Sequence, residues 1–184
     1  MRTSSTECVS EHLNLMERPL DPARLGDHLD RLYRAAWALS GSREDAEDLV
    51  QELCARVLAK PRRVDGDELA YLMRTLHNTF LTSIRTASRR PRADVEIELV
   101  AAADPRADRR PEEAAETQEV FTAIADLPGD FRLALVAVDI AGLSYGEAAE
   151  LLGTREATIA SRLFRAREQV ARTLREVPAP QRSV

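Results

Sequence analysis

The stretch Gly142–Arg167, GLSYGEAAELLGTREATIASRLFRAR, decides the fold of the second half of this chain. Ser144 and Glu147 have the spacing of a capping box, in which each side chain accepts a hydrogen bond from the other residue's backbone N–H at the start of a helix. Gly153 ends that short helix, and a second, longer helix follows it. Two helices joined by a glycine-containing turn predict a helix-turn-helix.

The second helix of this pair has an apolar face and a polar face beside it. Apolar side chains fall within about 60° of Ile159 on a helical wheel and predict the buried face: Leu163, Ala166, Val170 and Leu174. The candidate DNA-binding residues lie on the rest of the helix: Arg155, Thr158, Ser161, Arg162 and Arg165. Arginine and hydroxyl groups suit the major groove of DNA, where arginine contacts guanine edges and phosphates. A merely solvated face is the alternative interpretation.

The composition favours an all-α protein. Hydrophobic residues make up 44% of the chain and aromatic residues only 4%, and the abundant Ala, Leu, Arg and Glu are good helix formers. The formal net charge of −5 gives no sign of nucleic-acid binding. Residues 154–175 nevertheless carry six arginines against two glutamates, so the basic charge is local.

The cysteines and the N-terminal residues indicate the cellular compartment. Cys8 and Cys54 are far apart and predict no disulfide framework, which favours a reducing cytosol. The first 20 residues have no apolar run of the kind found in signal peptides. No stretch approaches the roughly 20 apolar residues of a membrane span. We therefore expect a cytoplasmic protein that makes no membrane contact of its own.

Helical spacing predicts two small helical bundles joined by a flexible linker. The bundles are expected over residues 21–92 and 111–176, and no segment alternates as a strand does. A flexible N-terminal arm (1–20), an acidic linker (93–110) and a tail (177–184) complete the chain. Residues 93–116 alone carry eight acidic side chains against three arginines, a net charge of −5.

An acidic stripe is predicted on the helix that follows Ser42. Asp45, Asp48 and Glu52 recur at helical spacing and therefore share one face. Such a stripe suits docking on a basic partner. Carboxylates are also favoured at the positive end of any helix, so the residues alone favour an ordinary solvated face.

These motifs resemble the extracytoplasmic-function (ECF) group of the bacterial RNA polymerase sigma factor family. Residues 142–153, with Thr158–Leu163 and Arg165–Arg167, resemble the domain that binds the upstream promoter element. Residues 45–52, DAEDLVQE, resemble the helix that binds core polymerase, and 70–78, AYLMRTLHN, resemble the helix for the downstream element. The resemblance covers about residues 24–92 and 112–175.

Several positions depart from the family pattern. The usual lysine of the recognition helix is Ala160, so one expected DNA contact is missing. Tyr71 replaces the common tryptophan, and Thr82 and Ser83 replace the usual Asp-Tyr pair. These changes concern the preferred bases and leave the domain assignment intact.

The resemblance implies a sigma factor that binds core RNA polymerase and directs promoter recognition. The residues implied to bind the beta-prime clamp are Asp45, Asp48, Gln51 and Glu52, and the beta subunit is a further partner. Double-stranded promoter DNA would contact the recognition helix. The residues implied to hold the melted strand are Asn78, Arg85, Arg89 and Arg90. An anti-sigma factor is a further expected partner. In the family the linker threads toward the active-site channel, where acidic charge would imitate RNA.

We expect no cofactor, no metal and no enzymatic activity. Cys8 and His12 have metal-like spacing, but no second pair completes a site. The sequence contains no glycine-rich phosphate loop and no nucleophile elbow. Two other functions remain open at this point. One is a stand-alone helix-turn-helix regulator, and the other is a helical adaptor that binds proteins and no DNA.

Overall fold

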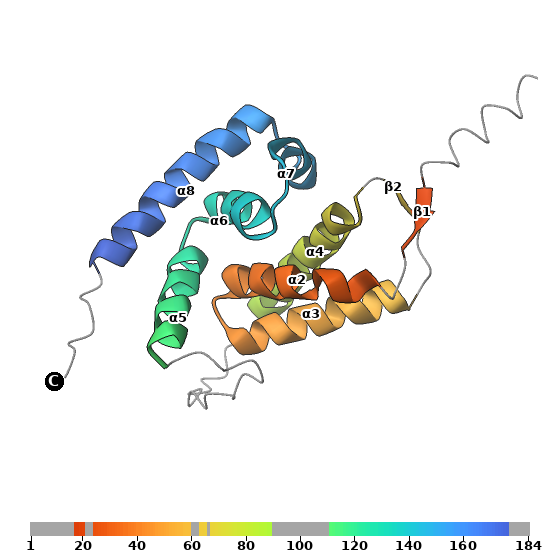
Figure 1. Ribbon diagram of the computed structural model, residues 1–184, viewed down its shortest axis with the longest axis horizontal. Helices are drawn as coiled ribbons and strands as arrows, with labels where there is room; N and C mark the ends of the chain where they lie inside the picture. The colour runs from red at the N-terminus through yellow and green to blue at the C-terminus, as the bar shows by residue number, and fades with distance from the viewer. Residues whose placement is uncertain (1–16, 21–23, 60–62, 66, 90–110, 177–184) are drawn as a thin grey trace, which may run out of the picture.

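The structure is a computed structural model that describes residues 17–20, 24–59, 63–65, 67–89 and 111–176. The first half contains three helices, α2 (Leu25–Ser40), α3 (Arg43–Leu58) and α4 (Glu68–Arg89). The second half contains α5 (Pro111–Ala125), α6 (Gly129–Leu135), the π-helical segment η2 (Val136–Ile140), α7 (Tyr145–Leu152) and α8 (Glu156–Glu176). Figure 1 shows α2 and α3 side by side, with α5 and α8 on the other side of the molecule. The predicted all-α class is confirmed.

Local signals in the sequence explain where α2 ends and α3 begins. Gly41 has a φ of 78°, a left-handed conformation that glycine adopts without a Cβ penalty, and its N–H bonds the Trp37 carbonyl. The Ser42 hydroxyl then accepts a hydrogen bond from the Asp45 N–H at 3.3 Å. This N-cap fixes the start of α3 and therefore the position of its acidic first turn.

The helix-turn-helix predicted from residues 142–167 is present as α7 and α8. The Ser144 N–H donates to Glu147 Oε2 at 2.8 Å, and the Glu147 N–H donates to Ser144 Oγ at 3.3 Å, which completes the capping box. Gly153, with a φ of 61°, ends α7 in the left-handed conformation. Ile159 and Leu163 are fully buried and anchor α8 on the rest of its domain.

The structure differs from the sequence pattern at two places. Residues 130–141 are mostly apolar and predict a single helix, but α6 gives way to η2, where the Ala141 N–H bonds the Val136 carbonyl one residue beyond α-helical spacing. Two short antiparallel strands, β1 (Glu17–Pro19) and β2 (Arg63–Asp65), also form where no strand was expected. Three residues are too few to show an alternating pattern. Of the expected arm, linker and tail, only residues 17–20 lie within the described residues.

The two halves pack directly against each other. Buried side chains of both halves form one continuous hydrophobic cluster that includes Trp37 of α2 and Phe121 of α5. Helix α2 contacts α5, α6 and η2 as well as α3 and α4, and α7 contacts α4. The sequence predicted two bundles and a tether, and this contact between the halves was not foreseen.

Candidate functional site

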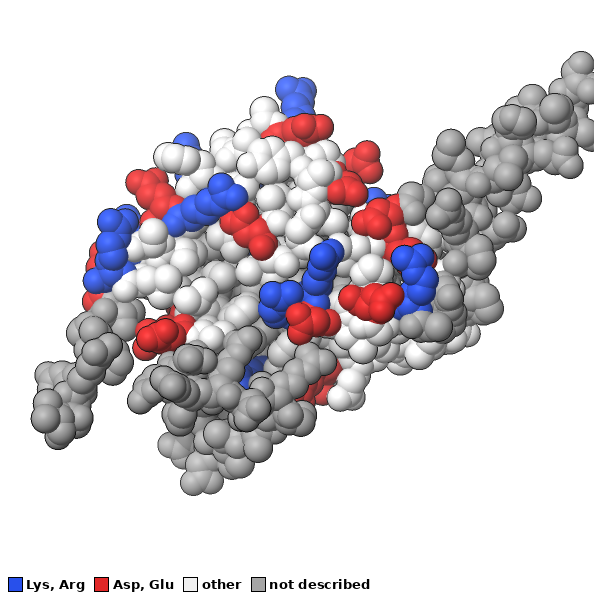
Figure 2. Space-filling view, in the orientation of Figure 1, with Lys and Arg blue, Asp and Glu red and all other residues white. Residues whose placement is uncertain are grey.

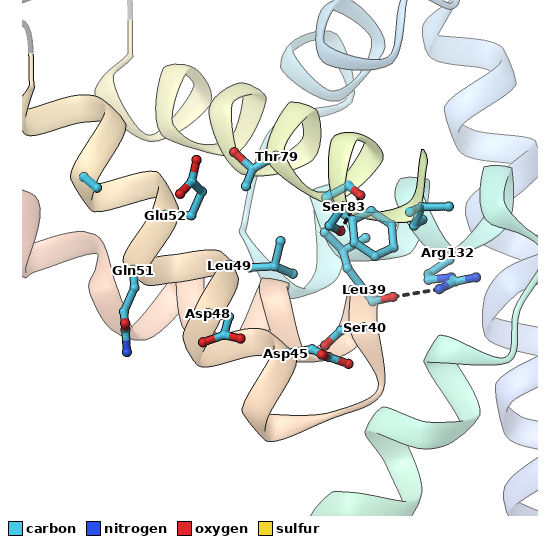
Figure 3. A pocket seen from close by; sticks show the side chains of 13 residues that line it. Leu39, Ser40, Asp45, Asp48, Leu49, Gln51, Glu52, Thr79, Ser83 and Arg132 are labelled. Carbon is cyan, nitrogen blue, oxygen red and sulfur yellow. Dashed lines mark hydrogen bonds between the residues drawn. The ribbon is translucent and has the colours of Figure 1, made fainter. Parts of the chain in front are cut away.

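A groove of about 870 Å³ lies between α3 and α4, with α2 and α6 at one end (Figure 3). All four residues predicted to bind core polymerase line its α3 side: Asp45, Asp48, Gln51 and Glu52. The α4 side is formed by Thr79, Phe80, Ser83 and Ile84. The structure therefore brings the predicted acidic stripe together with residues that the sequence pattern did not assign to a site.

The groove combines an apolar floor with an acidic rim. Leu49 and Phe80 are buried beneath it, whereas Ile84 is 48% exposed at its edge. The Glu52 carboxylate accepts a hydrogen bond from Arg56 Nε at 2.6 Å, one helical turn along α3, and Asp45 and Asp48 are exposed. An apolar side chain can enter such a groove while cations pair with its rim.

The opposite face of α4 carries the residues predicted to meet the melted strand. Asn78 and Arg85 are seven residues apart, so they lie on one side of the helix, and both are exposed. The Asn78 backbone carbonyl accepts a hydrogen bond from the Thr82 hydroxyl at 2.8 Å. Arg89 is the last residue of α4, but its side chain lies outside the described part, as does all of Arg90.

Histidine does not supply the charge near this face. Burial lowers the pKa of His77, the neighbour of Asn78, so its imidazole is neutral near pH 7. Its Nε2 is buried and has no hydrogen-bond partner among the described residues. Any electrostatic attraction for a phosphate backbone must therefore come from arginines, and Arg74 and Arg85 are both exposed on α4.

The second helix of the helix-turn-helix, α8, exposes its predicted DNA-binding residues with one exception. Arg155, Ser161 and Arg165 are exposed, and Thr158 is partly exposed beside buried Ile159. Arg155 stands just before α8, where its carbonyl accepts the N–H groups of Thr158 and Ile159. These four residues are available to a nucleic acid without rearrangement of the helix.

The exception is Arg162, which is bound within the protein. Its guanidinium pairs with the carboxylate of Asp130 in the first turn of α6, and its side chain is only 24% exposed. Arg167 is engaged more fully, with Nε and Nη2 on the two carboxylate oxygens of Asp139 at 2.9 and 2.6 Å. Arg167 therefore ties α8 to η2, and no pattern in the sequence indicated either carboxylate partner.

Charge by itself does not outline a binding surface. Figure 2 shows acidic and basic side chains interspersed over the face in view, without a large patch of one sign. The role of each helix must therefore be inferred from its individual side chains and from related proteins.

Family models match both halves of the chain. The model of sigma-70 region 2 matches residues 25–90, and that of sigma-70 region 4 matches residues 117–170. The chain is 37% identical over 155 residues to the ECF RNA polymerase sigma factor SigM of Mycobacterium tuberculosis, covering 80% of this chain and 73% of that protein. The chain belongs to the ECF RNA polymerase sigma factors. Members of this family direct transcription initiation.

Other relatives agree with this assignment. This sigma factor is 37% identical over 149 residues to the ECF factor SigE of Mycolicibacterium smegmatis, although it spans only 57% of that protein's length and the match covers 78% of this chain. Among solved structures, it matches the sigma factor RpoE of Bartonella quintana in complex with the anti-sigma factor NepR. That match has a TM-score of 0.63 and 26% identity, and it covers 94% of this chain and 100% of that one. None of the described helices is long and apolar enough to cross a membrane.

Proposed function

We propose that this sigma factor binds core RNA polymerase through the groove between α3 and α4 and directs it to a specific set of promoters. The observation that carries the proposal is that Asp45, Asp48, Gln51 and Glu52 all line one groove with an apolar floor. A helix face that is only solvated does not explain why Phe80 and Ile84 lie beside these polar residues in one groove.

The groove chemistry defines the partner surface. Acidic residues on the rim attract cations, and the apolar floor accepts a side chain from a helix laid into it. An amphipathic helix with basic residues has both properties. By resemblance to the family, we assign this partner to the beta-prime clamp of the polymerase and expect the beta subunit to contribute further contacts.

Double-stranded promoter DNA is assigned to α8. A recognition helix enters the major groove with its N-terminal residues on the base edges. Arg155 immediately precedes α8, Thr158 and Ser161 occupy its N-terminal part, and Arg165 follows one turn later. Arg162 belongs to the same set once its pair with Asp130 is exchanged for a DNA contact.

The melted strand is assigned to the outer face of α4. The Asn78 amide can hydrogen-bond an extruded base, and Arg85, Arg89 and Arg90 supply backbone attraction. Because Asn78 and the groove lie on opposite sides of α4, one helix would serve polymerase and DNA at the same time.

The remaining parts of the proposal follow from this function. Catalysis and its magnesium belong to the polymerase, so this sigma factor needs no cofactor and performs no reaction of its own. It works in the cytoplasm, where transcription takes place. An anti-sigma factor is a proposed partner, supported by the matched RpoE structure, which contains NepR.

The deciding experiment is run-off transcription with purified core polymerase and genomic promoter fragments. We expect specific transcripts only when the sigma factor is added. A chain that binds promoter fragments but never supports initiation would be a stand-alone regulator. A chain whose C-terminal domain shifts no DNA at low salt would be a protein-binding adaptor.

A further inference from the structure

The buried face of α8 does not by itself fix how this helix is turned about its own axis. Helix α8 lies against α6 (Figure 1), and Ile159 and Leu163 are fully buried. Burial of apolar surface is favourable but non-directional, so it specifies the orientation of a helix less sharply than hydrogen bonds do. Directional contacts are therefore needed to decide which side chains of α8 face outward.

Two ion pairs supply such contacts, one on each side of the buried face. At 100° per residue from Ile159, Arg162 lies at about 300° and Arg167 at about 80° on the helical wheel. Arg162 pairs with Asp130 in the first turn of α6. Arg167 pairs with Asp139 in η2. The two guanidinium groups therefore hold α8 from both flanks of its buried stripe.

The π-helical segment η2 explains how both carboxylates come to face α8. Asp130 and Asp139 are nine residues apart, so a regular α-helix would place them about 180° apart, on opposite sides. In η2 the Ala141 N–H bonds the Val136 carbonyl, which closes a turn with one extra residue. Each residue of this wider turn advances by less than 100°. The wide turn therefore rotates Asp139 away from the opposite side and towards α8.

The pair between Asp139 and Arg167 fixes an angle as well as a distance. Arg167 Nε and Nη2 donate to the two carboxylate oxygens at 2.9 and 2.6 Å, and two parallel hydrogen bonds of this kind define the relative orientation of the groups. Arg162, in the function proposed above, exchanges Asp130 for a DNA contact. The pair in η2 then remains to hold α8 while Arg162 is bound to DNA.

The position of Arg167 leaves little room for a direct contact with DNA or for a purely stabilising role. Arg165 and Arg167 are two residues apart, so they lie on nearly opposite sides of α8. The Arg167 side chain is 54% exposed and that of Asp139 is 30% exposed, and ion pairs in water contribute little to stability. Hydrogen bonds to Asp139, with a smaller contribution from Tyr145 at the start of α7, raise the pKa of Arg167. Helix α7, η2 and α8 thus meet at this guanidinium.

We propose that Asp139 and Arg167 are positioning residues for promoter recognition, whose pair sets the rotation of α8 and thereby aims its outward face at the base edges. The proposal rests on the proposed function of α8 and deepens it. A helix with its side chains has a radius of about 5–6 Å, so a rotation of about 20° moves its surface by about 2 Å. Such a shift breaks hydrogen bonds to bases, whereas attraction to phosphates tolerates it.

Arg167→Lys removes the directional contact and keeps the charge, because lysine lacks the planar fork of arginine. Its matched control is Arg172→Lys, since Arg172 is exposed on the same helix. Asp139→Asn is a second variant that keeps the shape of the side chain and removes its charge. Glu168→Gln, at another exposed position of α8, is the matched control for the loss of one negative charge.

Each full-length variant is assembled with core polymerase, and its affinity is measured for two DNA fragments. One fragment supports run-off transcription, and the other is the same fragment with its upstream element scrambled. The ratio of the two affinities is the readout, since both fragments carry the same phosphates. For Arg167→Lys and Asp139→Asn we expect this ratio to fall about fivefold or more, the effect of losing one base contact. Thermal melts and affinity for the scrambled fragment should equal those of the matched controls, which keep the parental ratio.

Two outcomes would overturn the positioning role and leave the proposed function intact. In one, Arg167→Lys discriminates between the fragments as well as the parent does. In the other, Arg167→Lys loses affinity equally for both fragments, which is the behaviour of a residue that only supports the fold. If the parent itself bound both fragments equally, the proposed function of α8 and the positioning role would fall together.

Discussion

Arg162 of the recognition helix is paired with Asp130, which stands 32 residues earlier in the first turn of α6. The Arg162 side chain is 24% exposed, so it lies against its own domain, whereas Ser161 is exposed. Arg165, three residues further along α8, is exposed and makes no ion pair with the described residues. The two arginines therefore start from different states when DNA arrives, and several expected results depend on that difference.

Replacing Arg165 by alanine should weaken binding to the upstream element by about 1–3 kcal/mol if the side chain makes a bidentate base contact. Arg162→Ala should have a smaller effect, because Arg162 must first give up Asp130. Fluorescence anisotropy with a promoter duplex measures both losses. A double alanine variant that binds and initiates like the parent would show that α8 is not the recognition helix.

Asp130→Asn should release Arg162 and therefore strengthen binding to any duplex. One further phosphate contact steepens the dependence of log affinity on log salt concentration by about one. A salt titration of affinity measures this slope, and a thermal melt checks that the C-terminal domain remains folded. An unchanged slope would show that Asp130 does not hold Arg162 away from DNA.

Reversing Asp48 and Glu52 to lysine should weaken association with core polymerase and leave affinity for promoter duplexes unchanged. The fold should survive, because the Glu52–Arg56 pair that is lost is exposed and worth only about 0.3–0.5 kcal/mol. Glu47→Lys is the matched control, since Glu47 is exposed on α3 and does not line the groove. The measurement is competition against another sigma factor for core enzyme. Undiminished competition by the double variant would contradict the groove assignment.

Asn78→Ala should lose discrimination at one position of the downstream element and slow the formation of the open complex. The cause is the loss of the amide that hydrogen-bonds an extruded base. Transcription from a promoter library gives the base profile, with Thr86→Ala as a control on the exposed surface of α4. Identical profiles for Asn78→Ala and the parent would exclude this role.

The capping box should make the helix-turn-helix sensitive to acid. Hydrogen bonds from Ser144 lower the pKa of Glu147 below its ordinary value near 4.5. The folded state therefore binds the Glu147 proton less readily than the unfolded state. This stabilisation is complete above pH 4.5 and is lost as pH falls through the lowered pKa.

Ser144→Ala should remove most of that acid sensitivity and cost typically about 1 kcal/mol at neutral pH. Thermal melts between pH 3 and pH 7 measure both effects, with Glu150→Gln on the exposed side of α7 as the control. Parallel stability curves for parent and Ser144→Ala would show that the box does not couple the helix start to pH.

Local chemistry makes much of this fold predictable from the sequence. Ser42, Ser144 and Gly153 fix helix ends through hydrogen bonds within a few residues, so the helix-turn-helix can be recognised from the residues alone. The acidic stripe on α3 is equally visible, because it depends only on helical spacing. These features need no knowledge of what lies across the space from them.

The contact between the halves is beyond such reasoning. Periodicity shows that a face is buried but not what buries it, and Phe121 is 84 positions away from Trp37 in the chain. The signal present in the sequence was Trp37 itself, because this large side chain lies outside the apolar face that Leu25, Leu29, Leu32, Ala36 and Leu39 form at helical spacing. The position of Arg132 at one end of the groove and the partners of Arg162 and Arg167 were missed for the same reason, since each contact crosses between distant segments.

Helix α2 is surrounded by protein along its second half, where five consecutive residues, from Ala35 to Leu39, are buried. Most helices of a small domain keep one side on which mutations accumulate without harm. Here the helix contacts α3, α4, α5, α6 and η2, and all five side chains are buried, so larger or polar substitutions should be tolerated poorly at each position. A saturation mutagenesis screen should therefore find no position from Ala35 to Leu39 that tolerates most substitutions. Exposed positions elsewhere on the protein should accept substitutions more readily.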